Sequence, residues 1–387
     1  MHRSTVELFS LPAAGPKHAF RAAELLLDDL TFRNELADLR EAVVRICDGL
    51  RSDESPGAAI YLRDGFFFRR LDEVRFPGAP AALAPDQTEQ LRHDASAYGF
   101  DGRGAATWNV GGRREWVVSW QFSRAFSNDE VVALEAVRLA LNQKLLESSF
   151  TGILQQAAAI QRSLLPDPLP TIPGFDLAAR SVPAESVGGD AYDALGLGPE
   201  TVAFAVADAS GHGLPAALEA RDVVVGLRMG AARHMKIGAT VEKLNGILCR
   251  STLSSRFVSL VYGELESDGR FQFVNAGHPH PILVNPAATT VFLETGIVLG
   301  VEPGVRHRIQ HGEIAPGGLL AVVTDGILEC ESPNGEQFGP GRVASLVRAL
   351  ADRPAAWIVS ALFEALEDHS REKSLADDAT VLVIRRE

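Results

Sequence analysis

Four widely separated aspartates carry the chemistry that this sequence suggests. Asp190 lies in Val-Gly-Gly-Asp-Ala-Tyr-Asp and Asp208 in Val-Ala-Asp-Ala-Ser-Gly-His-Gly. Asp325 follows an apolar run in Val-Val-Thr-Asp-Gly, and Asp377 precedes one in Ala-Asp-Asp-Ala-Thr. Carboxylate oxygens without a soft sulfur ligand favour Mg²⁺ or Mn²⁺ over zinc or copper. The four aspartates together therefore predict a metal-dependent enzyme.

The residues around these aspartates suit a site with two ions. Two such ions, about 3.5–4 Å apart, can hold a water between them, lower its pKa and stabilise charge on a phosphoryl oxygen. Gly188, Gly189 and Gly211 remove side chains where backbone passes close to an ion or a phosphate. The backbone carbonyl of Ala209, next to Asp208, is a further expected ligand. Each aspartate alone could be an ordinary turn or cap residue, so the prediction depends on their combination.

Composition narrows the class of protein. The chain has 387 residues, 46% of them hydrophobic and 22% charged, which predicts a globular protein of two domains. A net charge of −13 argues against nucleic-acid binding, which needs a basic face. No run of about 18 apolar residues predicts a membrane span. The three scattered cysteines form no C-x-x-C motif, and the N-terminus has no signal-peptide core, so we expect a cytoplasmic protein.

The N-terminal third of the chain has the pattern of a small α/β domain. Residues 1–30 form a leader, and a helical pattern begins near residue 31. Strands are expected over 58–62, 66–71, 106–110 and 115–120, with Asp64-Gly65 as a hairpin turn. Ser127 and Glu130 fit a capping box that opens a long helix. This layout over residues 31–147 resembles a GAF sensory domain, and the resemblance implies a small-molecule ligand.

The long helix continues beyond this domain with a heptad pattern. Apolar positions step by four and three residues until Pro166, which ends a helix. The pattern predicts a linker helix over residues 127–166 that forms a parallel coiled coil, and hence a homodimer. The alternative is an amphipathic helix that lies on its own domain. The seam positions are Leu139, Gln143, Leu146, Phe150, Ile153, Ala157, Ile160 and Leu164.

From residue 167 to 387 the pattern is one of strands joined by short turns. Consecutive strands with short connections pair antiparallel, which excludes a βαβ array. Helices fall into two groups, so we expect a two-sheet antiparallel sandwich with helices on both outer faces. Strands are expected near 176–182, 201–208, 256–266, 270–276, 280–285, 290–294, 306–310, 318–324 and 379–385, and helices over 214–234, 240–251, 340–351 and 355–369.

Six motifs in order give residues 155–386 a specific resemblance. The region is similar to the metal-dependent serine/threonine protein phosphatases of the PPM type, in the bacterial branch of SpoIIE and the stress-response sigma-factor regulators. The motifs are Gln161-Arg-Ser-Leu-Leu-Pro166, Val187-Gly-Gly-Asp190-Ala-Tyr-Asp193, Val206-Ala-Asp208-Ala-Ser-Gly-His-Gly213, Asn275-Ala-Gly-His-Pro279, Thr324-Asp325-Gly326 and Asp377-Asp-Ala-Thr380.

The resemblance implies an α-β-β-α sandwich with two Mn²⁺ or Mg²⁺ ions. Carried over, Asp208 bridges both ions, the Ala209 carbonyl binds one of them, and Asp190 supports or ligates the same centre. Asp325 and Asp377 ligate the other ion, and Asp378 ranks lower as the residue after a ligand. Asp190 and Asp208 are the catalytic residues, and a metal-bridging hydroxide attacks phosphorus. Ser210 stands where eukaryotic members carry a histidine acid, so the identity of the general acid is open, with His212 nearby.

The resulting prediction is a sensor-regulated phosphatase acting on phosphoserine or phosphothreonine of a regulatory protein. The resemblance implies an anti-sigma factor antagonist of the STAS type as that partner. The alternative is a pseudo-phosphatase that binds its partner in response to a signal without catalysis. A serine hydrolase centred on Ser210 is disfavoured, because Asp208 stands where a nucleophile elbow needs glycine. Zinc binding by His278 and His280 is disfavoured because His278 belongs to the Asn-Ala-Gly-His turn.

Overall fold

The computed structural model describes residues 35–49, 57–64, 67–75, 79–82, 98–100, 105–110, 116–121, 128–250, 257–371 and 375–387. The chain divides into two compact units, Met1–Ile153 and Leu154–Glu387, and each is treated by itself. The predicted leader over residues 1–30 and the capping residue Ser127 lie outside the described residues. Within the described ranges, no helix is both long enough and apolar enough to cross a bilayer.

The first unit contains a helix and a five-stranded antiparallel sheet. The sheet has the order β2-β1-β5-β4-β3, and the hairpin of β1 and β2 forms where Asp64-Gly65 predicted it. Leu39, Val43 and Ile46 on α2 are fully buried, as their helical spacing predicts. The short strand β3 was not predicted. The elements are α2 (Glu35–Gly49), β1 (Gly57–Asp64), β2 (Phe67–Val74), β3 (Tyr98–Phe100), β4 (Ala105–Val110) and β5 (Trp116–Gln121).

Helix α4 (Asn128–Leu164) runs from the first unit into the second and stops two residues before Pro166. Its side chains divide into two sets. Ala136, Val137, Ala140 and Leu141 are buried. The heptad positions Leu139, Leu146, Ile153 and Ile160 are instead 46%, 51%, 48% and 60% exposed. The predicted long helix is therefore present, whereas the coiled coil stays a prediction, since it needs a second chain.

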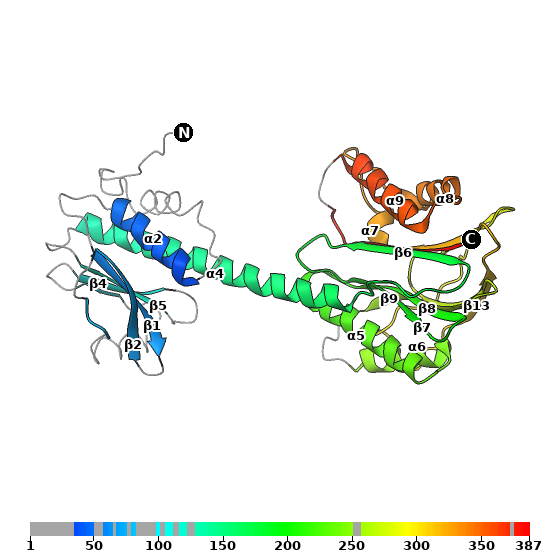
Figure 1. Ribbon diagram of the computed structural model, residues 1–387, viewed down its shortest axis with the longest axis horizontal. Helices are drawn as coiled ribbons and strands as arrows, with labels where there is room; N and C mark the ends of the chain where they lie inside the picture. The colour runs from blue at the N-terminus through cyan, green and yellow to red at the C-terminus, as the bar shows by residue number, and fades with distance from the viewer. Residues whose placement is uncertain are drawn as a thin grey trace. The chain divides into compact units, whose positions relative to one another are not determined.

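The second unit is a sandwich of two five-stranded antiparallel sheets (Figure 1). The first has the order β13-β10-β9-β8-β7, and the second has the order β12-β11-β14-β15-β6. The first sheet is built from β7 (Asp190–Gly196), β8 (Thr201–Ala209), β9 (Val258–Glu266), β10 (Arg270–Ala276) and β13 (Ile309–Glu313). The second is built from β6 (Phe175–Val182), β11 (Ile282–Val284), β12 (Thr289–Val291), β14 (Leu319–Val323) and β15 (Ala379–Arg386).

Helices cover the outer face of each sheet, which gives the predicted α-β-β-α layering (Figure 1). Helices α5 (Gly213–Ala232) and α6 (Ile237–Leu248) pack on the first sheet. Helices α8 (Gly339–Ala349) and α9 (Ala355–Ser370) pack on the second, and the one-turn helix α7 (Asp325–Leu328) follows β14. The central strands of each sheet are therefore buried on both faces.

Strand β8 shows how the sequence specifies these layers. Large and small apolar residues alternate along it, as the two-residue period of a strand requires. Its larger residues Val202, Phe204 and Val206 lie in the core between the two sheets. Its alanines Ala203, Ala205 and Ala207 lie in the core beneath α5 and α6, where their small size admits the helices.

Strand β7 is the main element that the sequence analysis did not predict. Its sequence, Asp-Ala-Tyr-Asp-Ala-Leu-Gly, contains two aspartates, two alanines and a glycine, which are all uncommon in strands. It forms because it pairs with β8 along its whole length, from Asp190 opposite Asp208 to Gly196 opposite Val202. Tertiary pairing here outweighs local propensity.

Candidate metal centre

Strand register brings Asp190 and Asp208 together. They lie directly opposite each other on β7 and β8. Asp208 has the same parity along β8 as Phe204 and Val206, whose side chains lie between the sheets. The two carboxylates are therefore directed into the space between the sheets, at one end of the sandwich.

The second sheet contributes the remaining aspartates at the same end. Asp325 follows β14, whereas Asp377 and Asp378 precede β15, and these two strands are antiparallel neighbours. The Thr324 N–H donates to the Thr380 carbonyl at 3.0 Å, which continues the pairing to the end of the sheet. The C-terminal end of β14 and the N-terminal start of β15 thus place these three carboxylates beside one another.

Thr324 joins the two sheets at this point. Its hydroxyl donates to Oδ2 of Asp190 at 2.8 Å and accepts the Thr380 N–H at 2.9 Å. Thr324 and Thr380 are fully buried, and Asp190 is only 4% exposed. The Thr-Asp-Gly motif contains Thr324, but no sequence pattern indicates that its side chain binds an aspartate 134 residues away.

Asp378 holds the loop that leads into β7. Its Oδ1 accepts the Ala184 N–H at 2.8 Å, and its Oδ2 accepts the Gly189 N–H at 2.6 Å. A Cβ atom on Gly188 would lie 2.5 Å from Oδ2 of the same carboxylate, so only glycine fits there. Both oxygens of Asp378 thus accept backbone N–H groups.

Gly189 permits the close approach of the Ala209 carbonyl. The Ala209 N–H donates to the Gly189 carbonyl at 3.1 Å, and a Cβ on Gly189 would lie 2.5 Å from the Ala209 oxygen. A Cβ on Gly326 would likewise collide with the carbonyl oxygen of Asp378. These glycines keep side chains out of the region between the two pairs of aspartates.

Burial and neighbouring charge disfavour the ionised form of three of the aspartates, Asp190, Asp208 and Asp325. Burial raises the pKa of Asp208 from its ordinary 3.8 to about 7, and the nearby carboxylates of Asp325, Asp377 and Asp378 add to this rise. Burial, followed by the charge of Asp208, raises the pKa of Asp190 well above its usual range. Burial and the charge of Asp377 also raise the pKa of Asp325. Carboxylates that raise one another's pKa in this way form a site for positive charge.

The residues present fit partly hydrated Mg²⁺ or Mn²⁺ ions. Oδ1 of Asp190 is buried and has no hydrogen-bond partner in the structure, so it has an unused acceptor. Among the described residues, no group of three or more His, Cys, Asp or Glu side chains is placed so that it could hold a metal ion. Mg²⁺ does not require such a group, because it usually keeps several waters and binds one or two carboxylates. Asp377 is exposed, and Asp208 and Asp325 are half-buried, which leaves the centre open on one side.

Ser210 is engaged in holding a neighbouring loop. Its N–H donates to the Phe257 carbonyl at 2.8 Å, and its hydroxyl accepts the Phe257 N–H at 2.9 Å. His212, at the N-terminus of α5, has a different partner. Its Nδ1 lies 2.8 Å from Oε1 of Glu185, and both side chains are more than half exposed. The imidazole is therefore oriented by a carboxylate from the loop before β7.

His278 has the structural role that its turn motif predicted. The side-chain amide of Asn275 accepts the His278 N–H at 2.9 Å and donates to the His278 carbonyl at 3.0 Å. The His278 Nδ1 lies 2.7 Å from the hydroxyl of Ser259, which pairs with Asp208 across the sheet. Burial lowers the pKa of His278 to about 3, so the ring is neutral and orders the strand beside Asp208.

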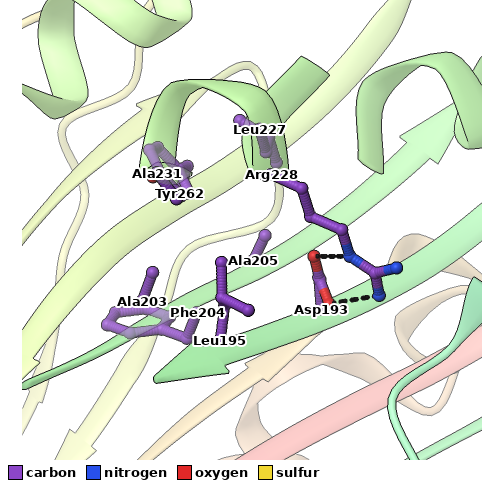
Figure 2. Close-up of a pocket in the computed structure, with 9 residues that line it drawn as sticks. All are labelled: Asp193, Leu195, Ala203, Phe204, Ala205, Leu227, Arg228, Ala231 and Tyr262. Atoms are coloured by element: carbon purple, nitrogen blue, oxygen red, sulfur yellow. Dashed lines mark hydrogen bonds and ion pairs between the residues drawn. The ribbon is translucent and has the colours of Figure 1, made fainter. Parts of the chain in front are cut away.

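Arg228 ties α5 to β7 through a contact that the sequence analysis missed. Its guanidinium forms two hydrogen bonds of 2.9 Å with the carboxylate of Asp193, and Nη2 also donates to the Leu164 carbonyl at 2.6 Å. Figure 2 shows this ion pair at the edge of a small pocket that Leu195, Phe204 and Tyr262 also line. Asp193 lies three residues after Asp190, so Arg228 braces the strand that carries the candidate ligand.

Comparison with known proteins identifies relatives of the second unit. The family profile described as Stage II sporulation protein E (SpoIIE) matches residues 198–387. Phosphoserine phosphatase RsbU of Bacillus subtilis (strain 168) is 26% identical over 244 residues, which cover 62% of this chain and 72% of that protein. The SiaA-PP2C domain of Pseudomonas aeruginosa has the same fold, with a TM-score of 0.56 at 20% identity over 62% of this chain and 98% of that domain.

A second solved structure, of the RsbU and RsbW domains of Rv1364c from Mycobacterium tuberculosis, is 28% identical with a TM-score of 0.50. It matches 56% of this chain and 61% of its own. The fold and these relatives thus define a serine/threonine phosphatase domain of the PP2C class. Within that class, residues 198–387 match the SpoIIE family model, and the relative RsbU is similar over much of its length.

Proposed function

We propose that this chain is a sensor-regulated, Mn²⁺- or Mg²⁺-dependent phosphatase that acts on phosphoserine or phosphothreonine of a regulatory protein. The observation that carries the proposal is the cluster of Asp190, Asp208, Asp325 and Asp377 at one end of the sandwich, where burial and mutual charge raise the pKa of three of them. Asp208 and Asp190, with the Ala209 carbonyl, would hold one side of the centre. Asp325 and Asp377 would hold the other.

The bound ions would supply Lewis-acid stabilisation of the phosphoryl oxygens and an activated water. The chain's own residues hold the carboxylates in position for these ions. Thr324 fixes the orientation of Asp190 through its hydroxyl, and Asp378 fixes the loop before it. The partly exposed carboxylates leave an open side for a phosphorylated side chain to approach. Such prior positioning removes the cost of arranging the charges during the reaction.

His212 is the residue that we propose as the proton donor to the leaving serine or threonine oxygen. Ser210, two residues earlier, has its hydroxyl engaged by the Phe257 N–H. Oε1 of Glu185 lies 2.8 Å from Nδ1 of the His212 ring, which leaves Nε2 available to donate a proton. This arrangement, in which a carboxylate orients a histidine four residues after Asp208 at the N-terminus of α5, suits general acid catalysis.

The substrate that we propose is a phosphorylated regulatory protein, and specifically an anti-sigma factor antagonist of the STAS type. The support comes from relatives: the Bacillus subtilis protein is a phosphoserine phosphatase, and the mycobacterial protein carries an RsbW domain besides its RsbU domain. For the first unit, we propose a GAF-like sensor over residues 31–147 that binds a small molecule. Its described part, an antiparallel sheet with the helix α2 packed on β1 and β2, supports a separate small domain.

The proposed function predicts metal-dependent hydrolysis of a phosphoserine peptide by the full chain. With Mn²⁺ present, the parent protein should release phosphate, and EDTA should abolish the release. Asp208→Asn should lower kcat by more than about 100-fold. Mutation of a residue that only supports a metal ligand already lowers activity by up to about 100-fold, and Asp208 is itself a proposed ligand. Asn334→Asp, on an exposed turn before α8, is a control for a change between Asp and Asn outside the centre.

Two outcomes would contradict this proposal. Full activity in EDTA would exclude metal-dependent catalysis. A parent protein that shows no Mn²⁺ binding by calorimetry, yet still binds its protein partner, would favour the pseudo-phosphatase instead.

A further inference from the structure

The last turns of α4 contact the loop that leads into Asp190 at the start of β7. The side-chain amide of Gln161 forms two hydrogen bonds with the backbone of one residue of this loop, Gly188. Its Nε2 donates to the Gly188 carbonyl at 2.6 Å, and its Oε1 accepts the Gly188 N–H at 3.2 Å. The neighbouring Ile160 is 60% exposed, so the helix turns Gln161, and not its apolar neighbour, toward the phosphatase domain.

Gly188 has little freedom to compensate for the loss of this contact. Its α-carbon is packed against the Asp378 carboxylate, where even a Cβ atom would lie at 2.5 Å. The next residue, Gly189, donates its N–H to that carboxylate at 2.6 Å. The backbone of Gly188 is thus hydrogen-bonded to Gln161 on one side and packed against Asp378 on the other.

The surroundings offer this loop little other support. A cavity of about 220 Å³ lies beside Gln161, Gly188, Asp190 and Asp378. Side chains therefore do not pack closely against the loop on this face, and directional hydrogen bonds must set its position. Thr324 fixes the Asp190 carboxylate from the second sheet, whereas Gln161 fixes the backbone two residues before it.

We infer that Gln161 is a positioning residue of the metal centre. From α4 it sets the Gly188-Gly189 backbone, and through it the carboxylates of Asp190 and Asp378. It acts through these residues and does not touch the reacting atoms. The inference rests on the proposed function, since it assumes that Asp190 belongs to a Mn²⁺ or Mg²⁺ site.

A merely structural role for Gln161 would have a different signature. Arg228 already ties the end of α4 to the domain through the Leu164 carbonyl. If Gln161 only docked the helix, its loss would lower thermal stability without changing the affinity of the folded protein for metal. A positioning role instead links the side chain to metal affinity and to kcat, as outer groups around metal sites do.

The test compares Gln161→Met with the parent in the full chain. Methionine keeps the length of the side chain but removes both hydrogen bonds. Gln156→Met is the matched control, because Gln156 lies on the same helix and is exposed. Gln161→Glu is a milder variant that keeps an acceptor for the Gly188 N–H but loses the donor to its carbonyl. Mn²⁺ affinity is measured by calorimetry on metal-free protein, after thermal melting shows each variant to be folded at the working temperature.

We expect Gln161→Met to weaken Mn²⁺ binding about 10- to 100-fold and to lower kcat more than it changes KM for a phosphoserine peptide. Gln161→Glu should give an intermediate affinity, and Gln156→Met should match the parent. Equal Mn²⁺ affinity for the parent and both Gln161 variants would overturn the inference. A parent protein that binds no Mn²⁺ would instead contradict the proposed function, so the two failures can be told apart.

Discussion

The aspartates of the centre have different roles, and the motifs alone do not distinguish them. Asp378 and Asp190 are both buried but have different partners. Asp378 accepts two backbone N–H groups, whereas Asp190 retains a buried oxygen that has no partner in the structure. Buried acceptors are almost always satisfied, so an unused carboxylate oxygen indicates a ligand. Environment, and not residue type, therefore separates the candidate ligand from the residue that holds the loop.

The proposed proton donor leads to a prediction about leaving groups. General acid catalysis typically contributes about 10²–10⁴-fold, so His212→Gln should lower kcat for a phosphoserine peptide by about 100-fold or more. The loss should be much smaller with p-nitrophenyl phosphate, because nitrophenolate leaves readily without a proton. Steady-state kinetics with the two substrates measures the difference.

Ser210→Ala provides the comparison, because the Ser210 hydroxyl binds the Phe257 N–H. This variant should affect both substrates to a similar extent. If His212→Gln slowed the two substrates equally, His212 would not be the proton donor.

At the scale of elements, the two sheets bring carboxylates together that neither would hold alone. Strands β7 and β8 supply Asp190 and Asp208, and the junction of β14 and β15 supplies Asp325 and Asp377. The resulting pKa shifts make stability depend on pH when no metal is bound. Because the pKa of Asp208 rises from 3.8 to about 7 on folding, the folded state keeps a proton that the unfolded chain releases within this range.

The free energy of unfolding of the metal-free protein should therefore fall as the pH rises from about 4 to about 7. Mn²⁺ needs the deprotonated carboxylates, so it should stabilise the protein more at about pH 8 than at about pH 5. Urea unfolding at several pH values, with and without Mn²⁺, measures both effects. Asp208→Asn should reduce the pH dependence, and an unchanged dependence in this variant would contradict the assignment to Asp208.

Local sequence patterns predict the elements with a regular spacing of apolar residues. They do not predict elements and contacts that depend on residues far away in the sequence. The alternation of β8 and the Pro166 stop of α4 are local signals, and both elements were predicted. Strand β7 was not, because its pairing with β8 outweighs its unfavourable composition. The four aspartates could be named from their motifs. The contacts of Thr324 and Gln161 could not, because each joins residues that only the fold brings together.

At the scale of the whole chain, α4 belongs to both compact units, with the boundary between Ile153 and Leu154. Its end contacts the phosphatase domain through Gln161 and the Leu164 carbonyl. Its exposed face carries Leu139, Leu146, Ile153 and Ile160, which repeat at heptad spacing. Water-exposed apolar residues along one seam are unfavourable in a single helix and favourable between two helices. This stripe supports the proposal that α4 pairs with a second copy of the chain.

The proposed homodimer can be tested by placing charge in the seam. Ile153→Asp with Ile160→Asp should make the full chain monomeric by light scattering. Four isoleucines of the dimer would lose burial worth about 1.5 kcal/mol or more each, which raises Kd at least about a thousandfold. Gln155→Asp with Gln156→Asp is the matched control, because both residues are exposed on the same helix and off the heptad seam. This control should remain a dimer, since it adds the same charge and loses at least as much helix propensity without changing a seam position. A parent protein that is already monomeric at working concentrations would show that the heptad pattern serves another purpose, and the coiled-coil prediction would then be wrong.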